Sequence, residues 1–287
     1  MSWRMVDEGW GRRAANFAAL LEPCAVREYV AVHRRLGLAP GQDLLDVACG
    51  AGLAIELATV QGAVCSGVDA SSRLVAVARQ RNPDSDLRVG DMAEPHFAAA
   101  SFDVVTSFRG IWGTTPAAMA EVRRVLRPGG RVALTFWGDM ASSPGGGLFA
   151  PFRLAGEPQL AHQSDMVALK QPGAAAQFLH AAGLDAGELF DVPFWLEFAD
   201  ARHYARSLAS TGPGYEAVQA VGEQAFEDAC LAAARPFERE GLPIRGGLWH
   251  PRHGPRLSSA PLDKRPWHSV VGRWPLTPGA PWPCPLS

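Results

Sequence analysis

The stretch Leu44-Leu45-Asp46-Val47-Ala48-Cys49-Gly50-Ala51-Gly52 decides the fold. Its apolar first half is typical of a buried strand, and its two glycines form a turn into the helix predicted over Leu53–Val60. A second strand, predicted over Val64–Val68, ends at Asp69, 23 residues after Asp46, which is the interval of one β-α-β unit. A glycine-rich turn after one strand and an acid at the end of the next indicate a nucleotide-type ligand at the carboxyl edge of a parallel sheet.

Strand and helix continue to alternate up to residue 137. Ser71 caps a helix predicted to run to about Gln80, and the proline and glycines at 127–130 end a helix predicted over Pro116–Leu126. Further strands are predicted over residues 87–89, 102–108 and 131–137. This order predicts an α/β fold with a parallel sheet and right-handed crossovers.

Beyond residue 137 the pattern loosens. We predict a helix over Pro172–Ala182, one strand over Leu189–Phe198, and a mostly helical segment over Ala201–Arg239 that breaks at Thr211–Gly214.

Composition excludes several classes of protein. The chain has 287 residues, with 27 Lys and Arg against 29 Asp and Glu, so it lacks the basic surplus of a nucleic-acid binder. Its five cysteines are an odd number without CxxC spacing, which argues against a disulfide scaffold and a metal site. The polar start is no signal peptide, and no apolar run reaches about 18 residues. We therefore expect a cytoplasmic protein without a membrane partner.

The glycine pattern also separates two kinds of nucleotide site. A dinucleotide fold requires G-x-G-x-x-G, whereas Ile55 stands here at the position of the third glycine. NAD and FAD are therefore disfavoured.

Together these motifs resemble those of the class I S-adenosylmethionine-dependent methyltransferases, of the small-molecule, UbiE-like type. The stretch at 44–52 matches the first motif, with Ala48 where many members have glycine. Four more segments follow in the order of the family: Gly67–Ser71 (ribose-binding), Gly90–Met92 (adenine-binding), Ser101–Val105 (fourth strand) and Arg123–Arg131 (the block before the fifth strand).

This resemblance implies a Rossmann-like, doubly wound, mostly parallel seven-stranded sheet with N-terminal helices and a helical lid. The expected parts are an N-terminal helical cap (residues 1–41), a core that binds S-adenosylmethionine (42–200), a helical lid (201–244) and a tail rich in Pro and Trp (245–287).

It also implies roles for individual residues. Asp69 accepts hydrogen bonds from the ribose hydroxyls, Asp91 binds the adenine amino group, and the Met92 amide binds a ring nitrogen. Phe108 lies beside the methionine end, and Asp46 acts through water or shapes the loop. The ligand passes close to the backbone of the remaining cofactor residues, which are Ala48, Gly50, Gly52 and, in the second motif, Ala70.

Residues for the methyl acceptor are less clearly marked. His203 is the best candidate for a general base, needed only if the acceptor must lose a proton, and an exposed or capping histidine is its alternative. Arg109 and Trp112, just after the fourth strand, are placed to orient the acceptor or to pack against the N-terminal helices. Trp3 and Trp10 precede the core and are candidates for a cap over the cofactor, and Trp10 is also a candidate for binding the acceptor.

The leading function is methyl transfer to a small organic acceptor, aromatic or polyketide-like, with oxygen as the first choice of methylated atom. Two alternatives share the same motifs: a cyclase or rearrangement enzyme on the methyltransferase fold, and a non-catalytic protein that binds the cofactor. The expected partner is a small molecule, and the expected assembly is a monomer or homodimer.

The C-terminal tail departs from the family pattern. Methyltransferases of this class end with an antiparallel strand, but Leu242-Pro243-Ile244 is short and interrupted, and nine of the 23 prolines follow Arg245. Only His268–Trp274 can form a strand, and only a short one. We therefore expect residues from about 245 onward to be mostly irregular and to contribute nothing to the cofactor site. Deletion of residues 246–287 is expected to change the cofactor affinity by no more than about threefold.

Overall fold

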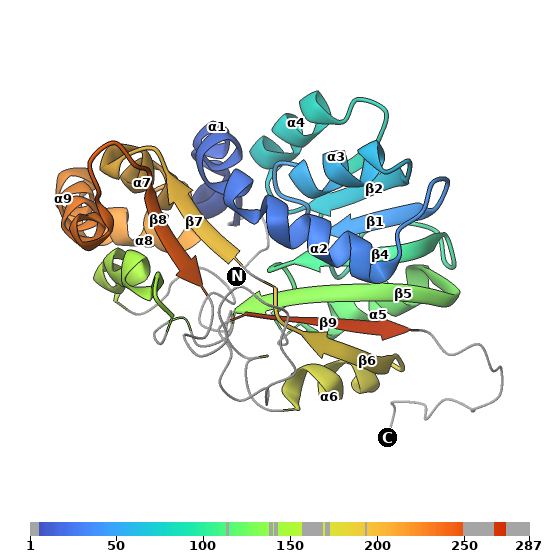
Figure 1. Ribbon diagram of the computed structural model, residues 1–287. Helices are drawn as coiled ribbons and strands as arrows, with labels where there is room; N and C mark the ends of the chain where they lie inside the picture. Colours follow the sequence, from blue (N-terminus) through green and yellow to red (C-terminus); the bar gives the residue numbers. More distant parts are fainter. Residues whose placement is uncertain are drawn as a thin grey trace, which may run out of the picture.

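A seven-stranded sheet forms the centre of the computed structural model (Figure 1). The structure describes residues 6–112, 115–137, 140, 143–156, 169, 173–192, 194–248 and 267–273. The sheet order is β3-β2-β1-β4-β5-β9-β6. Its strands are β1 (Asp43–Val47), β2 (Val64–Asp69), β3 (Asp86–Val89), β4 (Phe102–Phe108), β5 (Leu126–Trp137), β6 (Asp185–Phe190) and β9 (Trp267–Arg273). Neighbours from β3 to β5 are parallel, whereas β9 is antiparallel to both β5 and β6.

Both faces of this sheet are covered by helices, as the near-continuous apolar strands require. Successive strand residues point to opposite faces, so Leu44 packs in one hydrophobic cluster and Leu45 in the other. The first cluster includes residues of α2 (Val26–Leu36) and α3 (Leu53–Val60), and α4 (Ser72–Arg81) packs beside them. The second includes α5 (Pro116–Val125) and α6 (Ala174–Ala181). The predicted doubly wound α/β fold is confirmed.

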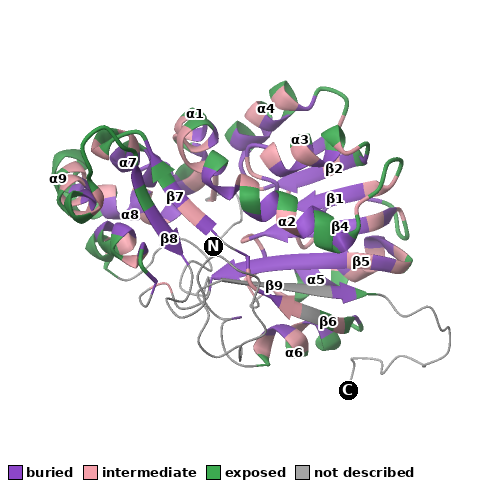
Figure 2. Ribbon diagram, in the orientation of Figure 1, coloured by how far each residue is buried: buried purple, intermediate pink, exposed green. Residues whose placement is uncertain are grey.

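A second, smaller unit lies beside the sheet, at the left in Figure 1. It contains the antiparallel pair β7 (Phe194–Phe198) and β8 (Ile244–Leu248). Around this pair lie α7 (Ala201–Leu208), α8 (Gly212–Val221), α9 (Glu223–Ala234) and the turn η6 (Gly146–Ala155). Figure 2 shows that these two strands are mostly buried, while exposed residues gather on the outer side of α9. This unit is called the lid below.

Short helical turns precede α2 and carry the chain past the edge of the sheet. They are η2 (Asp7–Gly11), α1 (Ala14–Asn16), η3 (Phe17–Leu21) and η4 (Glu22–Ala25). Asp7 ties the first of them to the start of α4, because its carboxylate accepts hydrogen bonds from the Ser71 and Ser72 hydroxyls. Ser71 itself accepts a hydrogen bond from the Leu74 amide at 3.1 Å, which confirms the predicted cap of α4.

Two expectations about the later part of the chain are wrong. The run Leu189–Phe198 is not one strand, because Phe190 ends β6 in the main sheet and Phe194 begins β7 in the lid. The expectation that the chain after about residue 245 departs from the family's final antiparallel strand is wrong as well. Residues 245–248 belong to β8, and Trp267–Arg273 is the predicted short strand, but it lies between β5 and β6 and completes the main sheet. The remaining tail residues, 249–266 and 274–287, lie outside the described part of the structure.

No helix in the described part of the chain has the length and apolar character that a membrane crossing requires.

Candidate functional site

A cavity of about 500 Å³ opens at the carboxyl ends of β1, β2 and β4, between the sheet and the lid. The strand order reverses between β1 and β4, and ligands of open α/β sheets bind at such a switch point. The volume falls within the range of about 300–1,000 Å³ that is usual for small-molecule sites. The cavity has two parts: a strand-edge half, formed by the residues that follow β1, β2 and β3, and an aromatic half toward the lid.

The glycine-rich turn after β1 bounds the strand-edge half. Ala48, Gly50 and Gly52 have φ values of 61°, 57° and 82°, a region that favours glycine. Ala48 and Gly50 line the cavity. Gly52 does not; a Cβ there would lie 2.8 Å from the Cβ of Ala78, so this glycine lets α3 approach α4.

Asp69 ends β2 inside the strand-edge half. One carboxylate oxygen accepts a hydrogen bond from the Gly50 amide and the other from the Ser71 amide, both at 2.8 Å. Each oxygen has capacity for a further hydrogen bond, because a carboxylate accepts about four in all. Burial raises the pKa of this carboxyl, while the two amides lower it. Ala70 follows on the cavity wall.

Two more predicted residues follow β3 on the same wall. Asp91 and Met92 both line the cavity, and the Asp91 carboxylate accepts a hydrogen bond from the Ala93 amide at 2.9 Å, which fixes the turn. Asp46, at the end of β1, also lines the cavity and accepts a hydrogen bond from the Thr106 hydroxyl at 2.7 Å. Burial raises the pKa of Asp46 to about 8.

Aromatic side chains dominate the other half of the cavity. Arg109 follows β4 among them, and its guanidinium lies 5.4 Å from the ring centroid of Phe194 and 5.9 Å from that of Trp137. The Trp112 indole N–H donates to the Arg109 carbonyl. The aromatic residues of the lining are Trp10, Phe17, Tyr29, Phe108, Trp112, Trp137, Phe149, Phe152 and Phe194.

Comparison with known proteins agrees with this geometry. Residues 45–134 match the family model described as "Methyltransferase domain". The chain carries a class I S-adenosylmethionine-dependent methyltransferase domain. The matched range begins in β1 and ends in β5, so it contains the whole strand-edge half of the cavity.

Two curated relatives resemble the methyltransferase domain. Demethylmenaquinone methyltransferase of Renibacterium salmoninarum is 31% identical over 131 residues, which cover 45% of this chain and 55% of the relative. Nocamycin O-methyltransferase of Saccharothrix syringae is 40% identical over 106 residues, which cover 33% of this chain and 38% of the relative. The matched region thus spans about half or less of the length of these relatives.

One solved structure similar to most of the chain is that of the [4+2]-cyclase SpnF. It matches with a TM-score of 0.50 at 18% identity and covers 88% of this chain and 82% of that one. This likeness shows a shared fold and nothing about the reaction.

His203 does not have the position that the general-base hypothesis requires. It does not line the cavity next to the methyltransferase domain. Its Nδ1 accepts a hydrogen bond from the Ala199 amide at 3.2 Å, and its Nε2 lies 3.2 Å from the Leu20 carbonyl oxygen. The imidazole therefore ties the start of α7 to η3. Trp3, the other residue considered for the cap, lies outside the described residues.

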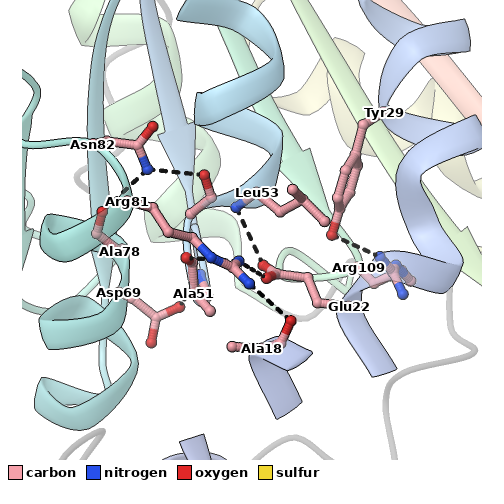
Figure 3. Close-up of polar contacts among 12 residues, drawn as sticks. Ala18, Glu22, Tyr29, Ala51, Leu53, Asp69, Ala78, Arg81, Asn82 and Arg109 are labelled. Carbon is pink, nitrogen blue, oxygen red and sulfur yellow. Dashed lines mark hydrogen bonds and ion pairs between the residues drawn. The ribbon is translucent and has the colours of Figure 1, made fainter. Parts of the chain in front are cut away.

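Glu22 also lines the cavity, although no sequence motif singled it out and the residue as a whole is only 4% exposed. Its carboxylate forms an ion pair with Arg81 of α4 (Figure 3). Burial raises the pKa of Glu22 to about 7, against the opposing effect of Arg81. A signal was present, since Glu22 is the one acid within the apolar segment 14–25, where an exposed acid is the ordinary interpretation.

Within the described ranges, no three His, Cys, Asp or Glu side chains are grouped so that they could hold a metal ion.

Proposed function

We propose that this protein transfers the methyl group of S-adenosylmethionine to an oxygen of a small, flat, largely apolar acceptor, aromatic or polyketide-like. One observation carries the proposal: a single cavity joins the glycine and acid edge of the methyltransferase domain to a wall of aromatic side chains. The similarity to a relative named an O-methyltransferase supports oxygen as the methylated atom.

The strand-edge half fits the cofactor. Each carboxylate oxygen of Asp69 can accept one more hydrogen bond, and in this proposal these come from the ribose hydroxyls. Asp91 and Met92 line the same half of the cavity and would bind the adenine. The backbone of Ala48 and Gly50 bounds the path toward Phe108, where the methionine end belongs in this proposal. The bound cofactor supplies an activated methyl group on sulfur.

The aromatic half positions the acceptor and excludes water. Methyl transfer requires in-line approach of the nucleophile, and a flat ring held between aromatic side chains loses little freedom on reaction. The described lining contains no histidine, and His203 is bound elsewhere. We therefore propose an acceptor whose hydroxyl is acidic enough to lose its proton without a histidine base, such as a phenol or an enol.

Cofactor binding is the first test. Calorimetric titration of the wild-type protein with S-adenosylmethionine should show micromolar-order binding. Asp69→Asn should weaken it by about a hundredfold or more, because one carboxylate oxygen is lost to the ribose hydroxyls. Asp84→Asn, an exposed residue of the α4–β3 turn, is the matched control and should bind like the wild type. A wild-type protein that fails to bind would overturn the proposal.

Product mass then separates the reaction classes. Incubation with a panel of phenols and enols should yield S-adenosylhomocysteine together with a product heavier by one methyl group. An isomeric product with no S-adenosylhomocysteine would instead establish cyclisation or rearrangement. Binding without turnover on any acceptor would favour a non-catalytic protein.

We further propose that the enzyme works in the cytoplasm as a monomer or homodimer, without nucleic acid or a membrane as partner. The balanced charge, a net −2, supports the first exclusion because it provides no basic surplus.

A further inference from the structure

Glu22 belongs to the turn η4, outside the region that matches the methyltransferase family. Its side chain reaches the cavity from the N-terminal segment and is itself only 2% exposed. A carboxylate this deeply buried destabilises the fold unless it is paired or serves a ligand. Its two oxygens have different surroundings.

Oε2 is held firmly. The Arg81 guanidinium forms an ion pair with it, and the same guanidinium donates to the carbonyl oxygens of Ala51 at 3.2 Å and Ala18 at 2.8 Å. Arg81 thus connects the glycine-rich turn to the N-terminal segment and fixes the direction in which the Glu22 carboxylate points (Figure 3).

Oε1 retains hydrogen-bonding capacity. Among the described residues, it accepts one hydrogen bond, from the Leu53 amide at a long 3.4 Å. It lies 3.6 Å from the position that a Cβ on Gly50 would occupy, so it faces the glycine-rich turn. The Gly50 amide donates to Asp69 on the other side. Glu22 and Asp69 therefore both lie close to Gly50 in the glycine-rich turn, and Glu22 is near enough to Arg109 for that charge to act on it.

The charge of the cavity is uneven. Its described lining has four carboxyl groups, those of Glu22, Asp46, Asp69 and Asp91, but only one guanidinium, that of Arg109. Glu28 already neutralises Arg109 at 3.0 Å. Asp46, with its pKa raised to about 8, keeps its proton at neutral pH, but the other three carboxyl groups still outnumber the single guanidinium. Such a lining favours a ligand with positive charge, and S-adenosylmethionine carries an ammonium group on its amino-acid end besides the sulfonium.

We propose that Glu22 binds the α-ammonium group of the methionine moiety through Oε1, with Arg81 as the positioning residue that holds the carboxylate in place. This rests on the proposed function, because it assumes that the cavity binds S-adenosylmethionine. It adds a ligand from the N-terminal segment, so the cofactor is bound from both the methyltransferase domain and the segment that precedes it.

The test compares two ligands that differ in the amino-acid end. S-adenosylhomocysteine has the ammonium group, whereas 5′-methylthioadenosine has the same nucleoside and a thioether but no amino acid. Both are titrated calorimetrically into the full chain. Glu22→Gln should weaken S-adenosylhomocysteine binding by about tenfold or more, through loss of a charge-assisted hydrogen bond, and should leave 5′-methylthioadenosine within about twofold.

Arg81 variants test the positioning role. Arg81→Met should reduce the affinity for S-adenosylhomocysteine relative to that for 5′-methylthioadenosine, and Arg81→Lys should restore part of the difference. Glu56→Gln, at an exposed position of α3, is the control and should change neither affinity. Thermal denaturation of each variant identifies any that fail to fold. If Arg81→Met does not fold, the two affinities are compared in Arg81→Lys.

Three results would overturn the inference. Glu22→Gln could leave both affinities unchanged, or it could reduce both by the same factor, which would make Glu22 a support of the turn only. Equal effects of Arg81→Met on the two ligands would likewise remove its positioning role. These failures differ from failure of the proposed function, in which the wild-type protein binds neither S-adenosylmethionine nor S-adenosylhomocysteine.

Discussion

Glu28 and Arg109, of which Arg109 lines the cavity, form a buried ion pair, with 3.0 Å between Glu28 Oε2 and a terminal nitrogen of Arg109. Glu28 is 0% exposed, and Arg109 has an uncommon φ of 60°. The Tyr29 hydroxyl lies 3.3 Å from the same guanidinium. The charge of Arg109 is thus already balanced, which favours a neutral acceptor over the acidic one that an arginine at this edge would otherwise indicate.

Breaking this pair should destabilise the protein. Glu28→Gln leaves the guanidinium without its counter-ion in a poorly hydrated place, and we expect a loss of about 3–5 kcal/mol in the free energy of unfolding. The double variant Glu28→Leu with Arg109→Met should lose less than the sum of its single variants. Urea denaturation of the wild type, of Glu28→Leu, of Arg109→Met and of the double variant measures the coupling free energy between the two residues. Strictly additive losses would contradict a stabilising ion pair.

Ala48 stores backbone strain in the glycine-rich turn. Because its φ of 61° is unfavourable for a side chain, Ala48→Gly should raise the free energy of unfolding by about 1 kcal/mol. Conversely, Gly110→Ala should destabilise the protein, since the new Cβ would lie 2.3 Å from that of Ala48. Combining the two substitutions should recover part of that loss. Thermal denaturation of the three variants gives the answer, and no recovery in the double variant would show that the contact is unimportant.

Asp46 should make the empty protein less stable as the pH rises. Burial raises its pKa to about 8 from the ordinary 3.8, so the folded state binds this proton more tightly than the unfolded state. Its contribution to stability is therefore complete below about pH 4 and is lost as the pH rises through about 8, by up to about 1.4 kcal/mol per pH unit.

The variant Asp46→Asn isolates this contribution. Its stability should fall less between pH 5.5 and about pH 8 than that of the wild type, as measured by urea denaturation. Glu22 contributes in the same direction, so some dependence remains. Equal slopes for Asp46→Asn and the exposed control Asp84→Asn would be inconsistent with this explanation.

Strand β9 should be essential to the fold. Val270 pairs with Leu134 on one side and with Leu189 on the other, so Val270→Pro removes a ladder donor inside the sheet. We expect loss of soluble protein, and the same for deletion of 246–287, contrary to what the sequence led us to expect. Val270→Thr, which keeps the donor and the β-branched shape, is the control. Soluble expression followed by circular dichroism is the measurement, and a folded Val270→Pro protein would refute the role of β9.

His203 should matter to stability and not to the chemical step. Replacing it with alanine removes the contacts to Ala199 and Leu20, at a cost of about 1–2 kcal/mol. Once an acceptor is known, kcat of His203→Ala at saturating substrate should stay within about twofold of the wild type. A kcat reduced by about a hundredfold or more, with a changed pH profile, would restore the general-base role.

The turn after β1 and the cap of α4 were predictable because each depends on residues close together in the chain. Gly50 and Gly52 permit positive φ where the strand ends, and Ser71 caps the helix that follows it by one residue. The same locality explains why the bounds of α3 and β4 agree with those predicted.

Other features depend on partners far apart in sequence. Arg81 is 59 residues from Glu22, and no local pattern indicates that they meet. Pro193 indicated a break in the run Leu189–Phe198, because proline cannot donate a ladder hydrogen bond. The apolar residues on both sides of it nevertheless favoured the prediction of one strand. The place of His203 likewise depended on η3, which lies more than 180 residues earlier.

The position of β9 has a consequence for synthesis of the chain on the ribosome. The strand that pairs with the outer edge of β5 is made about 130 residues after β5 itself. At about 5–20 residues per second, the edge of β5 waits between roughly 7 and 26 seconds for its neighbour to be made. During that interval the nascent chain presents an open strand edge to its surroundings. We therefore expect folding of the sheet to finish late, after translation of most of the chain, and its yield to depend on chaperones that cover exposed edges.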